Sequence, residues 1–297
     1  MKKLLVLLVA LMVLGVAFAD VSFSGGVDVS YTLTSTPLEI SDSVSLTWDR
    51  IQMTASGDGY YLRVRFYDSK NSFEIDQAYM TFTFDPVTLY VGKKGYWLNP
   101  YAFTDGNSLT WNYFGVSWYY PTAYLGAKVS FDNGSVYMTL DPRYAEGSAT
   151  PSVNVFGNVS FDPVSLGFIA QDNFKELGLG VTVNVAPVTA SAAFGYSIEN
   201  STITALLVGV NGTFDPVSVL GEVDLTDFNA IVVNGIVNYT INDKMDAGLN
   251  AKYNLGDKSF GTSAWFNYYY NDNITLTPSV SFDGEVITLN MNAHFDF

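Results

Sequence analysis

Within the last twelve residues of the chain, 286–297, apolar and polar side chains alternate without a fault from Ile287 to Phe297. The apolar positions are Ile287, Leu289, Met291, Ala293, Phe295 and Phe297, and the polar ones are Thr288, Asn290, Asn292, His294 and Asp296. This period of two predicts an extended strand with two different faces. The polar face is almost uncharged, and the apolar face continues to the final residue. A strand of a membrane-spanning barrel needs this pattern, because one face meets lipid, the other meets water, and every backbone group must pair within the sheet.

This stretch resembles the last strand of bacterial outer-membrane β-barrel proteins of the porin type, which ends in Phe with aromatic residues at alternate positions before it. Phe295 and Phe297 match. The resemblance implies an all-β, transmembrane antiparallel β-barrel in the outer membrane, with both termini periplasmic. It also implies contact with lipid and recognition by the barrel assembly machinery through Phe295 and Phe297. A homotrimer is compatible with the resemblance, and the sequence leaves the oligomeric state open.

The first nineteen residues have the pattern of a cleaved signal peptide. Lys2 and Lys3 precede an apolar run from Leu4 to Ala17, and Ala17-Phe18-Ala19 supplies small residues before the expected cleavage site. The alternative, a membrane anchor, needs ~20 apolar residues, which is more than this run provides. The mature chain is therefore expected to be residues 20–297, forming a single barrel.

Composition excludes several classes of function. Loss of Lys2 and Lys3 changes the formal charge from −15 to −17, so nucleic-acid binding is not expected. The chain has no cysteine, and it shows no phosphate-binding loop and no clustered metal ligands, so we expect neither a cofactor nor a metal. His294 is the single histidine, which leaves little for a catalytic triad. The sequence does not predict an enzyme.

Short turns recur at regular intervals along the chain. Phe-Asp-Pro-Val occurs at 84–87, 161–164 and 214–217, and Asp-Pro is a strong strand-stopping pair. With the other turn signals, tight turns fall near 58, 85, 132, 162, 187, 215, 242 and 272, and all intervals but one are 25 to 30 residues. Eight tight turns on one side, with both termini there, predict 8 × 2 + 2 = 18 strands; 16 is the alternative.

Two segments break the alternation. It slips by one residue around Trp48-Asp49-Arg50, and Glu74 and Asp76 fall in phase with the apolar residues that follow them. We expect β-bulges or positions above the bilayer at both places. Aromatic residues also gather where strands should leave the hydrocarbon. One predicted belt contains Phe84, Phe131, Phe161, Phe214, Tyr270, Phe282 and Phe297, and the other contains Tyr31, Phe66, Phe73, Tyr196, Tyr253 and Phe260.

The exceptional interval lies between the turns near 85 and 132. Its middle, about 95–121, is rich in Tyr, Trp, Asn and Gly and is the third connection on the long-loop side. The resemblance implies that this third loop folds into the barrel and narrows it, although Asp105 is its single acidic residue. The alternative is two further strands, because 109–119 favours β structure.

Basic residues gather just before this interval. Since Leu62, Val64 and Phe66 should face lipid, Arg63 and Arg65 should face the lumen, and the same phase argument applies to Arg50 and Lys94. The resemblance implies that such a wall opposes acids on the third loop, so Arg50, Arg63, Arg65, Lys94 and Asp105 are the predicted pore-lining residues. The alternative is that these cations merely hydrate a wide lumen.

The sequence thus favours a porin, that is, a water-filled channel for passive diffusion of small hydrophilic solutes and ions. An 18-stranded barrel is wide enough to leave an aqueous channel. One alternative is a structural or adhesive outer-membrane barrel without conductance. Another is a secreted soluble β protein, whose strands would alternate equally well.

Overall fold

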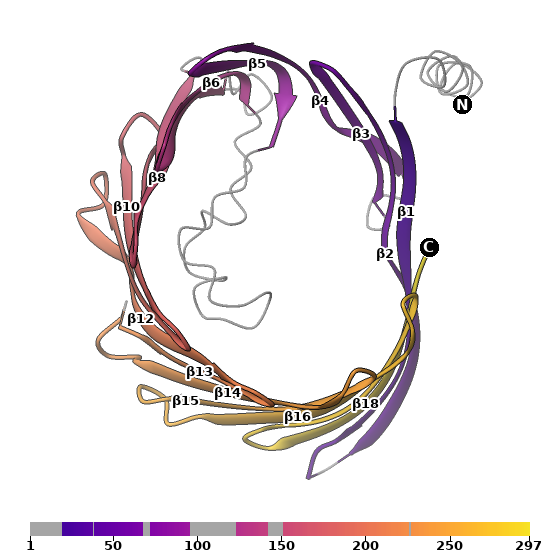
Figure 1. Cartoon of the computed structure of the whole chain (residues 1–297). Coiled ribbons are helices and arrows are strands. Elements are labelled where there is room, and N and C mark those ends of the chain that lie inside the picture. Colours follow the sequence, from indigo (N-terminus) through magenta and orange to yellow (C-terminus); the bar gives the residue numbers. More distant parts are fainter. Residues whose placement is uncertain (1–19, 38, 68–71, 96–122, 142–150, 226) are drawn as a thin grey trace.

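The described part of the chain forms one closed sheet of 18 antiparallel strands (Figure 1). The computed structural model describes residues 20–37, 39–67, 72–95, 123–141, 151–225 and 227–297. Each strand pairs with the next in sequence, and β1 pairs with β18 to close the ring. Within these ranges no helix is long and apolar enough to cross a membrane.

The strands are β1 (Asp20–Ser35), β2 (Ile40–Gly57), β3 (Tyr60–Tyr67), β4 (Ser72–Phe84), β5 (Val87–Lys94), β6 (Ala123–Phe131), β7 (Gly134–Asp141), β8 (Ser152–Phe161) and β9 (Val164–Gln171). They continue with β10 (Glu176–Val185), β11 (Val188–Ser197), β12 (Thr202–Phe214), β13 (Val217–Asp224), β14 (Val232–Asn242), β15 (Met245–Asn254), β16 (Phe260–Asn271), β17 (Ile274–Asp283) and β18 (Val286–Asp296).

Eight two-residue turns, at the predicted places, join the strands along one edge of the barrel, here called the turn rim. The opposite edge, the loop rim, carries the nine other connections, of which 95–122 is the longest. Both ends of the barrel chain lie at the turn rim, because Gly25 and Phe297 exchange two backbone hydrogen bonds of 3.0 Å. The predicted strand count of 18, rather than 16, is confirmed.

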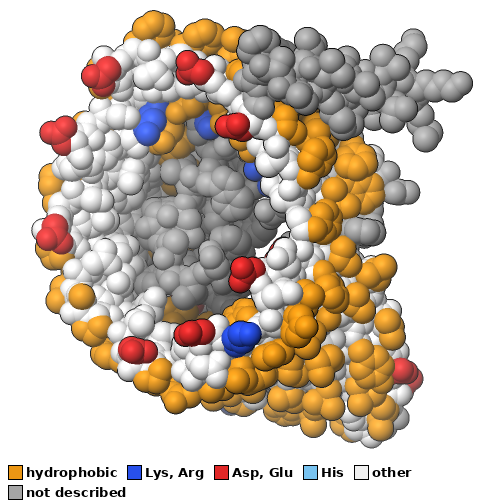
Figure 2. Space-filling model, turned by 45° about the vertical axis from the view of Figure 1, so that its right-hand side comes forward, with side chains coloured by type: hydrophobic (Ala, Val, Ile, Leu, Met, Phe, Trp, Pro, Cys, Tyr) orange, Lys and Arg blue, Asp and Glu red, His pale blue; other side chains and the backbone are white. Residues whose placement is uncertain are grey.

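Apolar side chains cover the outer face and most inner positions are polar, which reverses the arrangement of a soluble protein. Leu249 and Met291 are each 51% exposed, whereas Asn154 is 1% exposed. Figure 2 shows apolar side chains over the outside of the wall, whereas charged side chains and other non-apolar side chains or backbone surround most of the hollow. An exterior of this kind suits hydrocarbon as its solvent.

Both predicted irregularities are β-bulges. Gly26 pairs with Arg50 and Val27 with Trp48, so Asp49 is the extra residue in β2. Arg63 pairs with Gln77 and Val64 with Ile75, so Asp76 is the extra residue in β4. A bulge adds one residue to its strand, so the alternation of faces holds on either side of the bulge but is shifted by one position across it. This shift explains the two breaks in the sequence pattern.

The aromatic belts are placed correctly with one exception. Phe84, Phe161 and Phe297 lie at the turn rim with 64%, 59% and 58% of their surface exposed. Phe282, however, lies next to the last residue of β17, beside the 284–285 connection, and is therefore at the loop rim, so its assignment to the turn-rim belt is wrong. β17 begins at the turn rim near residue 273, so its far end must lie at the opposite rim.

The seam between β1 and β18 is held by a polar cluster inside the barrel. The His294 ring lies between two carboxylates, with Nδ1 2.9 Å from Asp28 and Nε2 3.1 Å from Asp296. Asn292 donates to Asp28 at 2.9 Å and accepts from Ser30 at 2.7 Å. The single histidine therefore helps to join the first strand to the last.

Candidate functional site

Cations gather on the inner face of neighbouring strands β3 to β6. Arg63 and Arg65 come from β3, Lys94 ends β5, and Lys128 lies in β6. Arg63 and Arg65 alternate with Leu62, Val64 and Phe66, which pair in the sheet with Ala55, Met53 and Ile51 of β2. The four residues are called the basic wall below.

The two arginines of the basic wall share one carboxylate. Arg63 Nε donates to Asp76 Oδ2 at 2.6 Å, and Arg65 Nη1 lies 3.3 Å from the same oxygen. Arg65 Nε also donates to Gln52 at 3.1 Å. The three charged side chains are only 12–14% exposed, so the pairing is less screened than on an open surface. Asp76 reaches both arginines because the bulge turns it inward.

Lys94 is held by aromatic rings. Its Nζ lies 4.3 Å from the ring centre of Tyr79 and 4.7 Å from that of Tyr90. Tyr79 stacks in turn on Tyr61, with ring centres 5.3 Å apart. Cation–π attraction of this kind fixes the ammonium group against the wall. Lys93, the preceding residue, donates to the Ile75 backbone carbonyl at 2.7 Å.

Lys128 extends the basic wall by one strand and was missed from the sequence. Its Nζ lies 5.5 Å from the ring centre of Tyr137, which stacks on Phe156 at 5.0 Å. The signal was present, because Lys128 alternates with the outward-facing Leu125, Ala127 and Val129. Lys128 lies apart in sequence from the cluster of basic residues that ends at Lys94, so the prediction did not include it.

Two predicted site residues have no described side chain. The backbone of Arg50 pairs with Gly26, and the prediction for its side chain lies outside the described part of the structure. Asp105 lies wholly outside the described residues, as does nearly all of the predicted third loop at 95–121. The structure therefore brings together Arg63, Arg65 and Lys94 from the predicted set and adds Lys128 and Asp76.

Amides and hydroxyls line the inner face from β14 through β18. Asn250 donates to Asn234 at 2.8 Å, Asn267 donates to Asp246 at 2.8 Å, and Thr277 donates to Asn267 at 2.8 Å. These side chains bond across strands, so they present a polar but nearly neutral surface. Within the described ranges, no group of three or more His, Asp or Glu side chains could hold a metal ion.

A third sector of the inner face is apolar, which the sequence analysis did not foresee. The inner apolar patch runs over β8 to β14 and consists of Phe156, Ile169, Ala193, Ala205, Leu207, Leu220, Val232 and Ile236, each 1–7% exposed. These residues share the face of the buried polar residues Asn154, Glu222 and Asn234, whereas Val208 and Val210 on the opposite face are 47% and 46% exposed. Small and polar residues such as Gly178 and Thr182 occupy other inner positions of this sector, so the sequence pattern did not predict an apolar patch.

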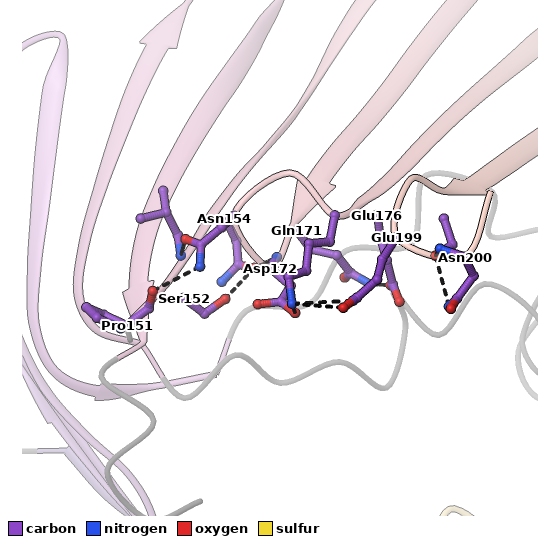
Figure 3. A network of polar contacts seen from close by, with 12 residues as sticks. Pro151, Ser152, Asn154, Gln171, Asp172, Glu176, Glu199 and Asn200 are labelled. Atoms are coloured by element: carbon purple, nitrogen blue, oxygen red, sulfur yellow. Dashed lines mark hydrogen bonds and ion pairs between the residues drawn. The ribbon is translucent and has the colours of Figure 1, made fainter. Parts of the chain in front are cut away.

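Hydrogen bonds tie together the loop rim above the patch (Figure 3). Asn154 accepts from the Asp172 backbone at 3.0 Å and donates to Thr139 at 3.3 Å. Asn173 accepts from the Val153 backbone at 2.9 Å, and Lys175 pairs with Glu199 at 3.3 Å. The 172–175 connection is thus bound to its neighbours on both sides and forms a fixed part of the rim.

No protein-family model and no curated protein matches the sequence. Solved structures do match. A five-substitution mutant of Rh. blastica porin superposes with a TM-score of 0.60 at 15% identity, covering 94% of this chain and 100% of that chain. A two-substitution mutant of the same porin gives 0.60 at 15% identity with the same coverage. A triple mutant of Rhodopseudomonas blastica porin gives 0.58 at 14% identity, again covering 94% and 100%. At these identities the similarity is one of fold, and the chain has a porin-type barrel.

Proposed function

We propose that this chain is a porin of the bacterial outer membrane, a water-filled channel through which small hydrophilic solutes and ions diffuse passively. One observation carries the proposal: the 18-stranded ring is closed, apolar outside and mainly polar inside. A closed ring leaves no unpaired strand edge in hydrocarbon. A ring of this size is wider than its own side chains can fill.

The test is electrical. The mature chain, residues 20–297, is refolded in detergent and added to a planar lipid bilayer in potassium chloride. Stepwise current increases of constant size are expected, one for each inserted barrel. A chain that refolds, inserts and carries no current is instead a structural or adhesive barrel. A chain that stays soluble without detergent is a secreted β protein.

We propose further that the third loop, about 95–121, folds inward and narrows the channel. The inner apolar patch supports this, because eight apolar side chains that face the barrel interior are only 1–7% exposed. Apolar surface of that kind is costly to leave in water, at about 25 cal/mol per Å². A loop rich in Tyr, Trp and Phe has the composition to cover it.

The basic wall is our candidate for the selectivity site at the narrowest point. It consists of Arg63, Arg65, Lys94 and Lys128; we propose that Arg50 adds to it, and that Asp105 is the acid that the third loop would bring opposite. Support comes from the low exposure of the two arginine side chains, 12% and 13%, which leaves their charge weakly screened. Asp76 offsets part of that charge, so the wall should favour anions only moderately.

Location and assembly follow from the same proposal. Residues 1–19 are removed on export, the termini and the turn rim face the periplasm, and the nine loop-rim connections face outward. Phe295 and Phe297 present the apolar end of β18 to the assembly machinery. Their exposed fractions, 39% and 58%, leave both rings accessible for such contact.

A further inference from the structure

Aromatic rings follow one another across the inner face of strands β3 to β8. Tyr61 and Tyr79 stand directly opposite each other in the sheet with ring centres 5.3 Å apart, and Tyr79 and Tyr90 follow at 6.1 Å. Beyond β6 the row resumes with Tyr137 stacked on Phe156 at 5.0 Å. An aqueous channel needs no such row on its inner face, since polar side chains would serve to hydrate it.

Glycines opposite the rings give them room to lie along the wall. Gly92 pairs with Tyr79, and Gly126 pairs with Tyr90. The backbone at Gly92 has a φ of 114°, and a Cβ there would lie 2.4 Å from the Ala78 carbonyl oxygen, so no other residue fits. Tyr61, Tyr79, Tyr90 and Tyr137 all remain half-buried, which leaves part of each ring facing the lumen.

Two ammonium groups are set among these rings. Lys94 lies 4.3 Å and 4.7 Å from the ring centres of Tyr79 and Tyr90, and Lys128 lies 5.5 Å from that of Tyr137. Lys128 also pairs directly with Tyr137 in the sheet, and it stands opposite Thr88, two residues from Tyr90. We call Tyr61, Tyr79, Tyr90, Tyr137, Lys94 and Lys128 the tyrosine–lysine wall. It offers ring surface and positive charge at one place.

We infer that the tyrosine–lysine wall is a binding site for small aromatic carboxylates on their way through the channel. The carboxylate would pair with Lys94 or Lys128, while the planar ring would pack on the tyrosines at the distances usual for aromatic pairs. The inference deepens the proposed channel function, on which it rests. An inorganic anion would meet the same charge but gain nothing from the rings.

The test measures how benzoate changes the chloride current through single channels in a planar bilayer. Acetate serves as the probe with the charge and no ring, and benzyl alcohol as the probe with the ring and no charge. Benzoate is expected to reduce the chloride current at a half-blocking concentration about fivefold below that of acetate, as one aromatic contact would give. Benzyl alcohol is expected to have no effect in the same range.

Variants locate the effect. Lys94→Met and Tyr90→Ser should each raise the half-blocking benzoate concentration about fivefold, whereas Tyr90→Phe should retain the wild-type value. The matched control is Lys175→Met, which removes a lysine from the 172–175 connection, where its side chain is 46% exposed. A chloride current that benzoate and acetate block equally overturns the inference and leaves the channel function intact. If Lys175→Met raises the half-blocking benzoate concentration as much as Lys94→Met does, the inference is overturned too. Absence of any current refutes the channel itself.

Discussion

Asp76, the extra residue of the bulge in β4, lowers the net positive charge of the basic wall. As the extra residue of a bulge it turns inward and pairs with both Arg63 and Arg65, at 2.6 Å from Arg63 Nε and 3.3 Å from Arg65 Nη1. The two guanidinium groups and one carboxylate leave a single net positive charge. A count of arginines alone therefore overstates the positive field on this side of the lumen.

The first prediction uses this trio. Replacing Arg63 and Arg65 together by Gln removes two positive charges beside the Asp76 carboxylate, so the reversal potential across a salt gradient should move toward cation preference. Adding Asp76→Asn to the double variant should move it part of the way back. The same neutralisation at Lys175, which pairs with Glu199 on the rim, is the control. If the double variant and wild type have equal reversal potentials, the basic wall does not govern selectivity.

Phe297 is the subject of the second prediction. Its backbone exchanges two hydrogen bonds with Gly25, whereas its ring is 58% exposed. Phe297→Ser keeps the backbone bonds and removes the apolar ring, so export should continue while insertion into the outer membrane falls. Fractionation of cells that express the variant measures both. Phe297→Tyr, which keeps the ring, should insert normally, and normal insertion of the serine variant would count against a role for the ring.

At the scale of the strand, the two faces of β15 meet different solvents. Leu249 is 51% exposed on the outer face, whereas Asn250 on the inner face donates to Asn234 at 2.8 Å. The same alternation holds in β18, where Met291 faces outward and Asn292 bonds to Asp28. The faces that the sequence pattern predicted for these strands agree with the structure.

A third prediction tests this assignment. Leu249→Arg should destabilise the folded barrel by roughly 2–4 kcal/mol if it lies near the bilayer midplane. Asn250→Arg should cost only about 1 kcal/mol, because it loses one neutral hydrogen bond and keeps its contact with water. Urea unfolding in lipid vesicles measures both changes. Equal destabilisation by the two substitutions would mean that the faces are assigned wrongly.

The sequence predicted strands better than it predicted the inner wall, and the reason is physical. Turn residues and strict alternation are local signals, so the eight turns, the 18 strands and both bulges could be read from neighbouring residues. The inner apolar patch was missed because Leu207 and Leu220 lie on strands whose other inner residues are small or polar. Which face they occupy follows from pairing between strands, and a single strand does not reveal it.

At the scale of the molecule, the inner face divides into three sectors. The basic wall and its tyrosines occupy β3 to β7, the inner apolar patch occupies β8 to β14, and amides and hydroxyls line much of the remainder. In the proposed channel, a solute would meet cations on one side and neutral hydrogen-bonding groups on another.

The fourth prediction concerns the loop proposed to cover the inner apolar patch. Deleting residues 101–112 should raise the single-channel conductance, because the proposed inward loop loses its central part. Deleting 228–230 from the connection between β13 and β14 is the control and should leave conductance near the wild-type value. Dye binding to newly exposed apolar surface gives an independent reading, since the inner apolar patch should become accessible. Unchanged conductance and unchanged dye binding after the first deletion would place the narrowest point elsewhere.

The pairing of β1 with β18 has a consequence for the order of events during biogenesis. Asp28 and His294 touch across the seam although 266 positions separate them along the chain. The ribosome makes one partner first and the other last, so the ring cannot be sealed until synthesis has finished. Contacts this remote in sequence form slowly. Until β1 and β18 pair, both strands have unpaired edges through which chains can aggregate. The newly made chain therefore keeps both of these edges unpaired until its last strand is complete.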